Sequence, residues 1–122
     1  MITLLVDEGH AFDYLSILQI KLDLDKDNVL KYSTFNLCKQ HLIEQIGINK
    51  FETIIDSQEY KDCYEANKQT FDAVDDAKLD KVPASYVDKC NFKRFVAKQK
   101  LQSAFFDEQL SEVKIGYDRY KD

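Results

Sequence analysis

Acidic residues and a histidine crowd together near the start of the chain, in the stretch LLVDEGHAF. On a helix, residues three and four apart are neighbours, so Asp7, His10 and Asp13 would share one face. A carboxylate beside an imidazole can bind a divalent metal ion or orient the histidine as a general base. The simpler interpretation is a helix start, where acids are favoured by the helix dipole and the histidine is exposed. We therefore favour the helix start and regard His10 as incidental.

The second histidine also has an acidic neighbour. His41 stands three residues before Glu44, which places the two side chains on one helix face. A metal site that joined both clusters would take its nitrogen and oxygen ligands from Asp7, His10, His41 and Glu44. Since the two histidines have unrelated spacings, we expect no cofactor. The alternative is Mg²⁺ or another divalent cation.

Carboxylates also gather along the segment between residues 62 and 76, at Asp62, Glu65, Asp72, Asp75 and Asp76. Facing carboxylates on helices can hold Mg²⁺ ions against phosphate groups, and Glu65, Asp72 and Asp76 are the candidate ligands. The stretch DAVDD resembles the paired acidic motifs of the all-α nucleotide pyrophosphohydrolases, but the ExxE motif that accompanies them in that family is missing. A solvated helix face accounts for these acids without a metal, and we prefer it.

Polar residues interrupt the apolar pattern at Glu8, Asn67 and Arg94, in three separate segments. Because burying a charge is costly unless it is paired, the economical arrangement places Glu8 against Arg94, with Asn67 completing the hydrogen bonds. A guanidinium suits a fixed pair better than an ammonium does, and the chain has very few arginines. Such a cluster is either an internal network that fixes helix register or a pocket for a small polar or anionic ligand. We favour the network.

The elements that must position these residues are predicted to be helices. Apolar residues recur at spacings of three and four, which is typical of helices. The chain has one proline and three glycines, too few for the many turns that a β-fold needs. The first helix is expected from Met1 to Leu22; the alternative makes ITLLV a short strand and begins the helix after Gly9. The other helices are expected over 34–46, 49–55, 58–79, from Pro83 or Ser85 to 106, and over 107–115. Ser33 and Ser57 are the expected N-caps of the helices over 34–46 and 58–79, and Gly47 ends the first of these two. Asn49 and Glu52 have the spacing of a capping box for the helix over 49–55.

These segments predict one all-α domain over residues 1–122, a helical bundle of about four main helices plus short helices, with 117–122 as a tail. The segment 56–80 is rich in acids, whereas 89–106 carries lysines and an arginine without any acid. A short connection joins them, so we expect antiparallel neighbours whose charges complement one another.

Composition argues against several classes of function. The net charge of −5 and the scarcity of arginine disfavour nucleic-acid binding, although Phe92 and Phe95 interleave the basic run. No apolar segment approaches membrane-spanning length and no signal peptide is recognisable, so we expect a cytoplasmic protein with no membrane partner. Cys38, Cys63 and Cys90 form no CxxC pair and lie among apolar neighbours, which predicts reduced and buried thiols.

Two functions remain. The favoured one is a non-enzymatic protein-interaction or homo-oligomerising module, because a chain of this size cannot bury all of its seven tyrosines and eight phenylalanines. Its partner would be another protein or a second copy. The alternative is a metal-dependent hydrolase of a phosphorylated small molecule that uses helical carboxylates. Since no motif for covalent catalysis or phosphate binding occurs, we expect no catalytic residue.

Overall fold

The computed structural model describes residues 1–107, which form five α-helices and no strand. The prediction of an all-α bundle is therefore confirmed. Within the described residues, no helix is long and apolar enough to cross a membrane. The helices are α1 (Glu8–Leu24), α2 (Val29–Ile46), α3 (Ile48–Ile55), α4 (Gln58–Lys78) and α5 (Ala84–Phe105).

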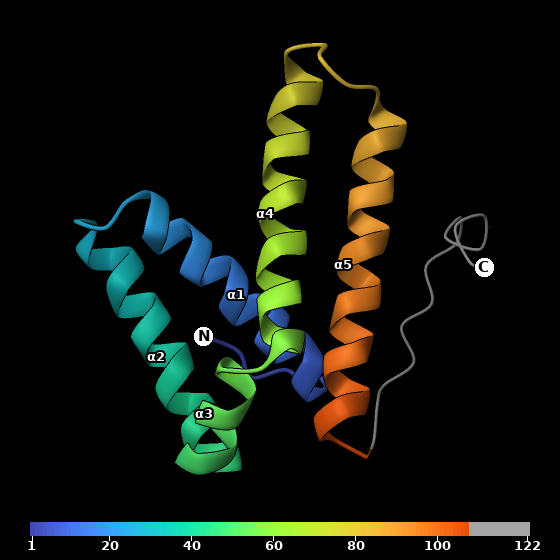
Figure 1. Cartoon of the computed structure of the whole chain (residues 1–122). Helices are drawn as coiled ribbons and strands as arrows, with labels where there is room; N and C mark the ends of the chain where they lie inside the picture. The colour runs from blue at the N-terminus through green and yellow to red at the C-terminus, as the bar shows by residue number, and fades with distance from the viewer. Residues whose placement is uncertain (108–122) are drawn as a thin grey trace.

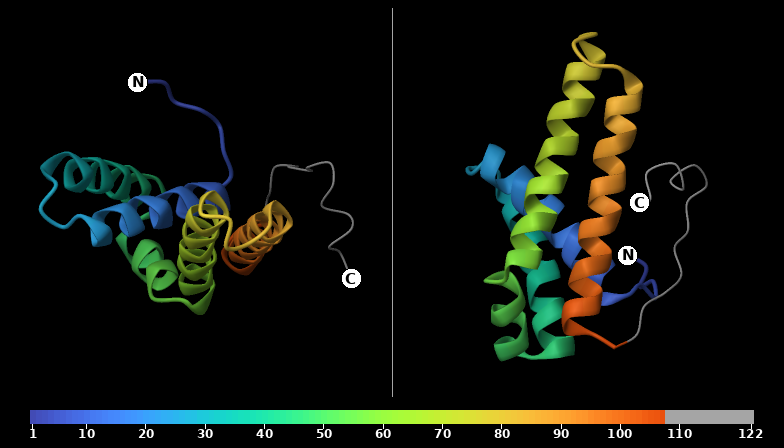
Figure 2. Two further views of the ribbon diagram at one scale, coloured as in Figure 1. Left: turned by 90° about the horizontal axis from the view of Figure 1, so that it is seen from above. Right: turned by 45° about the vertical axis from the view of Figure 1, so that its right-hand side comes forward.

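The helices form two antiparallel pairs. The α4 and α5 helices lie side by side, as their short connection predicts, and make the longest part of the molecule (Figure 1). The α1 helix crosses behind the lower part of this hairpin, contacts both of its helices, and is followed by α2, which packs against α1. Seen from above, α1 lies along one side of the α4–α5 hairpin (Figure 2). The short α3 helix joins α2 to α4 at the lower end.

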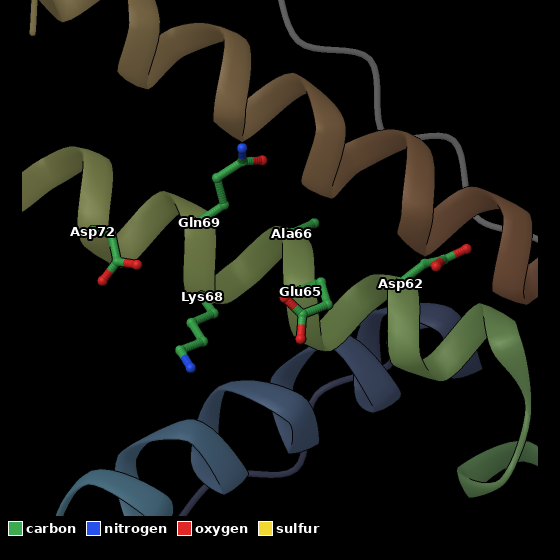
Figure 3. Close-up of a pocket in the computed structure, with 6 residues that line it drawn as sticks. All are labelled: Asp62, Glu65, Ala66, Lys68, Gln69 and Asp72. Carbon is green, nitrogen blue, oxygen red and sulfur yellow. The ribbon is translucent and has the colours of Figure 1, made fainter.

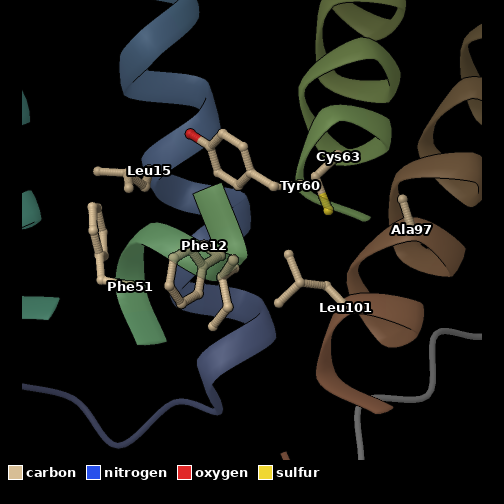
Figure 4. Close-up of a cluster of buried hydrophobic side chains, with 8 residues drawn as sticks. Phe12, Leu15, Phe51, Tyr60, Cys63, Ala97 and Leu101 are labelled. Atoms are coloured by element: carbon tan, nitrogen blue, oxygen red, sulfur yellow. The ribbon is translucent and has the colours of Figure 1, made fainter. Parts of the chain in front are cut away.

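The hydrophobic core lies where α1, α3, α4 and α5 meet (Figure 4). Phe12 is fully buried at its centre, with its ring centroid 5.9 Å from that of Phe51 and 6.2 Å from that of Tyr60. The Phe12 and Tyr60 rings meet edge to face, which is a favourable geometry for two aromatic rings. The buried members of this cluster are Phe12, Leu15, Phe51, Ile54, Tyr60, Cys63, Ala97 and Leu101.

The first helix begins at Glu8, so the prediction that it starts at Met1 is wrong. Residues 1–7 form no strand either, and the alternative for ITLLV is also wrong. The Asp7 carboxylate caps the helix by accepting a hydrogen bond from the backbone N–H of His10 at 2.9 Å. Apolar residues at helical spacing stay helical only when a neighbouring surface covers them, and Leu4 and Leu5 are exposed.

Two further helix starts differ from the prediction. The α2 helix begins at Val29 because the Asn28 side chain accepts a hydrogen bond from the Lys31 N–H, and Ser33 lies inside the helix. Asn49 likewise lies inside α3, which follows Gly47 without a side-chain cap. The cap at Ser57 is confirmed, since its hydroxyl accepts from the Tyr60 N–H at 3.1 Å. The predicted helix over 107–115 and the tail over 117–122 lie outside the described residues, apart from residue 107.

All three cysteines are free, as predicted, but they differ in burial. Cys63 and Cys90 are buried, but Cys38 on the outer α2 helix is only half-buried, so the prediction of a buried thiol is wrong for Cys38. Burial raises the pKa of Cys63 to about 12, and it also raises the pKa of Cys38. A thiol reacts as its thiolate, so both shifts slow modification near neutral pH.

We expect a thiol reagent at pH 8 to label Cys38 well before Cys63 or Cys90 in the native chain. The reagent can reach Cys38 directly, whereas the other two thiols become accessible only when the helices around them separate. The measurement is the spectroscopic count of modified thiols over time, and the Cys38→Ala variant should lose the fastest phase. Two or more rapidly modified thiols would contradict the packing of α4 against α5.

Candidate functional site

A buried polar cluster lies at the junction of α1, α4 and α5. Asn67 on α4 donates one hydrogen bond to the Asp13 carboxylate at 2.8 Å and another to the Ser16 hydroxyl at 2.7 Å. The Ser16 hydroxyl in turn donates to the Asp13 backbone carbonyl at 2.7 Å. These three residues are buried, and together they satisfy both hydrogens of the Asn67 amide.

Arg94 on α5 completes this cluster through its guanidinium group. Its Nη2 lies 3.5 Å from the Asp13 carboxylate, and its Nη1 donates to the Asn91 side chain at 3.2 Å. The Arg94 side chain is 29% exposed and that of Asp13 is 11% exposed, so the ion pair is partly shielded from water. The Nε atom of Arg94 is buried and has no hydrogen-bond partner in the described residues.

The prediction that Glu8 pairs with Arg94 is wrong, because Asp13 is the acid that contacts it. Glu8 stands in the first turn of α1, at the end of α5, where it accepts a hydrogen bond from the Gln102 side chain at 3.3 Å. Asp13 lies further along α1, next to Asn67. Asn67 and Arg94 therefore do belong to one cluster, but the acid that links them is Asp13. The sequence had predicted Asp13 on the outer face of the helix, with His10.

One signal in the sequence could have identified Asp13. Asp13, Ser16 and Ile20 are spaced three and four residues apart, so they lie on one face of a helix. Because Ile20 is apolar, this face is a candidate for burial. The apolar pattern of α1 is wide, so two different faces could have been chosen as the buried one. The position of α4 decides between them.

The glycine of the opening stretch has a packing role. The N–H of Gly9 donates to the Gln102 side chain at 2.5 Å, where α1 crosses α5. A Cβ atom at this position would lie 2.7 Å from the backbone oxygen of Lys98, closer than real Cβ atoms come to other heavy atoms. Gly9 therefore allows the two helix backbones to approach closely.

The histidines are not part of a shared site. Asp7 is the cap of α1, and His10 is on its first turn, whereas His41 and Glu44 lie exposed on α2 with 3.8 Å between ring nitrogen and carboxylate. Among residues 1–107, no three side chains of the His, Cys, Asp or Glu types are grouped so that they could hold a metal ion. The arrangement that would join the two histidine clusters is thus not formed in the described part of the chain.

The acidic stripe lines a shallow hollow along α4. Asp62, Glu65 and Asp72 surround it together with Lys68, and every residue of its lining comes from α4 (Figure 3). Asp76, the remaining metal candidate, is not part of this lining. A two-metal site clamps its ions between carboxylates that face one another. The lining of this hollow supplies carboxylates from a single helix.

A second hollow, of about 360 Å³, lies between α4 and α5. Its floor is apolar, formed by Ala66, Val96 and their neighbours, while its α4 edge carries an acid and its α5 edge carries lysines. The contrast in charge between these two helices was predicted to complement the contact between them, and here it also lines an open hollow. The residues that line this hollow are Asp62, Ala66, Phe92, Lys93, Val96, Ala97 and Lys100.

No protein-family model, curated protein or solved structure matches this chain. Neither of these two hollows is lined by Asp13, Asn67 or Arg94.

Large apolar side chains are exposed mainly in the first third of the chain. The α2 helix has no fully buried residue, because it contacts the rest of the molecule along one face only. Leu24, Val29 and Leu30 flank the turn between α1 and α2, and each is more than 70% exposed. Other exposed large apolar residues are Met1, Ile2, Leu4, Leu5 and Val6, before α1, and Tyr14, Tyr32 and Leu37 on α1 and α2. The exposed apolar surface, as we call it below, is the group at the α1–α2 turn, Leu24, Val29 and Leu30.

Proposed function

We propose that this chain is a non-enzymatic protein-interaction module that binds a partner protein through its exposed apolar surface. The observation that carries the proposal is the group of large apolar side chains at the α1–α2 turn, which the described residues leave uncovered. Single exposed leucines are ordinary, but a concentration of this kind is typical of interaction surfaces.

The energetics agree with this proposal. Burying one leucine or valine side chain contributes roughly 1.5–3 kcal/mol, so a partner that covered a few of these residues would gain a substantial free energy. Leu24, Val29 and Leu30 lie at one turn and could enter one hydrophobic pocket of a partner together. The acids around them, among them Asp25 and Asp27, would form the polar rim that surrounds such contacts.

We expect a photo-crosslinking amino acid at Leu30 to capture a partner protein in the cells that express this chain. The same amino acid at Lys81, an exposed position in the α4–α5 connection, is the matched control and should give no specific product. The measurement is the band pattern after irradiation, and the Leu24→Ser variant should weaken the Leu30 product. Identical patterns at Leu30 and Lys81 would contradict the proposal.

The alternative function, hydrolysis of a phosphorylated small molecule with a divalent metal, predicts a different result. Mg²⁺ or Mn²⁺ with a nucleotide would then raise the melting temperature of the purified chain, because a ligand that binds the native state stabilises it. The Asp72→Asn variant would lose that rise, since Asp72 lies within the acidic hollow on α4. We expect flat melting curves; a rise that depends on Asp72 would favour the hydrolase.

A further inference from the structure

The α4–α5 hairpin has one face that the other described helices leave open. Arg94 faces α1, where it meets Asp13. Successive residues advance by about 100° around a helix, so Val96 points to the opposite side of α5. The hollow between α4 and α5, which includes Val96, therefore opens away from α1. Figure 1 shows α1 behind the hairpin, on the other side.

The two edges of this open face carry opposite charges. Within residues 1–107, no ion pair of 4.0 Å or less joins the acids of the α4 edge to the lysines of the α5 edge. All of these side chains are exposed, and Figure 3 shows Asp62 pointing toward the α5 side of α4. The acidic edge comprises Asp62, Glu65 and Asp72, and the basic edge comprises Lys89, Lys93 and Lys100.

We propose that two copies of this chain associate face to face through their α4–α5 hairpins and form a four-helix interface. A twofold axis parallel to the helices would place each acidic α4 over the basic α5 of the other copy. A twofold axis across the helices would instead place acid over acid and lysine over lysine. Since like charges in contact are repelled, the charges select the first arrangement.

The size of this face is compatible with a stable pair. Helices of 21 and 22 residues are about 30 Å long, and two of them side by side offer roughly 600 Å². Two copies would together bury about 1,200 Å², at the lower end of the range for specific interfaces. Ala66, Phe92 and Val96 provide the apolar centre, and the acids and lysines around it provide the complementary rim. An interface with so many exposed charges should weaken as salt is added.

The test uses the full chain in sedimentation experiments at low salt. The wild type should form a dimer that dissociates on dilution, with a dissociation constant about tenfold higher at 0.5 M than at 0.05 M NaCl. An acid-reversed variant (Asp62→Lys with Asp72→Lys) and a lysine-reversed variant (Lys93→Glu with Lys100→Glu) should each be monomeric. Mixed together, they should form a heterodimer, because each edge again meets its opposite charge.

Matched controls separate this interface from a general effect of charge. A variant with Asp27→Lys and Glu52→Lys has the same change in net charge as the acid-reversed variant, but these residues lie in the α1–α2 turn and α3. It should dimerise like the wild type. Far-ultraviolet circular dichroism should show that all variants keep their helix content, as expected for substitutions of exposed residues.

A variant with all four reversals reports which twofold axis is used. In the proposed arrangement this variant pairs with itself, because its basic α4 lies over the acidic α5 of the other copy, and it does not pair with the wild type. If α4 instead lay over α4, the variant would pair with the wild type and not with itself. A wild type that stays monomeric at low salt, or reversed variants that still dimerise alone, would overturn the proposal. Either result would leave the proposed function intact, because the exposed apolar surface lies elsewhere and is tested by crosslinking to another protein.

Discussion

Replacing Asp13 with alanine is expected to lower the free energy of unfolding by about 2–4 kcal/mol. Breaking a buried ion pair by removing one partner costs about 3–5 kcal/mol, and the partial exposure of Arg94 reduces that figure. The substitution also removes the acceptor of one Asn67 hydrogen bond, so a buried amide hydrogen loses its partner. Urea denaturation followed by circular dichroism measures the change.

A double-mutant cycle with Arg94→Met shows whether the two residues act as a pair. Each single substitution leaves one charge without its partner, whereas the double substitution removes both, so the double variant should lose clearly less stability than the sum of the single losses. Glu8→Gln is the control, and it should cost only about 0.5–1 kcal/mol because Glu8 is half-buried and a glutamine oxygen can still accept the hydrogen bond from the Gln102 amide. Additivity of the Asp13 and Arg94 losses would show that the ion pair contributes nothing to stability.

Replacing Gly9 with alanine is expected to cost about 2–3 kcal/mol, although alanine is the better helix former by up to about 1 kcal/mol. The loss arises because the new Cβ would lie 2.7 Å from the Lys98 backbone oxygen, which cannot move without shifting α5. The α1 helix must then tilt away from α5, which weakens the hydrogen bond from the Gly9 N–H to Gln102. The midpoint of urea unfolding gives the size and the sign of the effect.

Two variants serve as controls for Gly9. Gly47→Ala meets no atom within 4 Å, but its φ of +87° with ψ of 152° is a conformation that essentially only glycine adopts, so the backbone alone should cost about 1–3 kcal/mol. Gln102→Ala combined with Gly9→Ala should not recover the lost stability, because the nearest obstacle is backbone rather than side chain. A Gly9→Ala variant more stable than the wild type would show that α1 and α5 do not approach as closely as described.

The opening stretch LLVDEGHAF combines these roles in a few residues. Asp7 ends the irregular segment and caps α1, Glu8 accepts a hydrogen bond from Gln102, and Gly9 allows the close crossing with α5. Phe12 then enters the core. The mixture of acidic, small and apolar residues is explained by the helix cap, the crossing with α5 and the core.

Local interactions explain what the sequence by itself determined. The all-α class, the α4 helix with its Ser57 cap, the glycine that ends α2 and the antiparallel α4–α5 pair all follow from spacing, caps and short connections. Each of these depends on residues close together in the chain, which carry the same preferences in any fold.

Only the tertiary structure decided which faces are covered. The apolar pattern of residues 1–6 suits a helix, but no neighbouring surface packs against it, and the helix begins at Glu8 instead. The wide apolar face of α1 left two choices of acid for Arg94, and the place where α1 crosses α4 and α5 selected Asp13 over Glu8. Which side of the α4–α5 hairpin is covered likewise depends on where α1 packs. Such outcomes depend on contacts between residues far apart in the chain, which the spacing along a single helix does not encode.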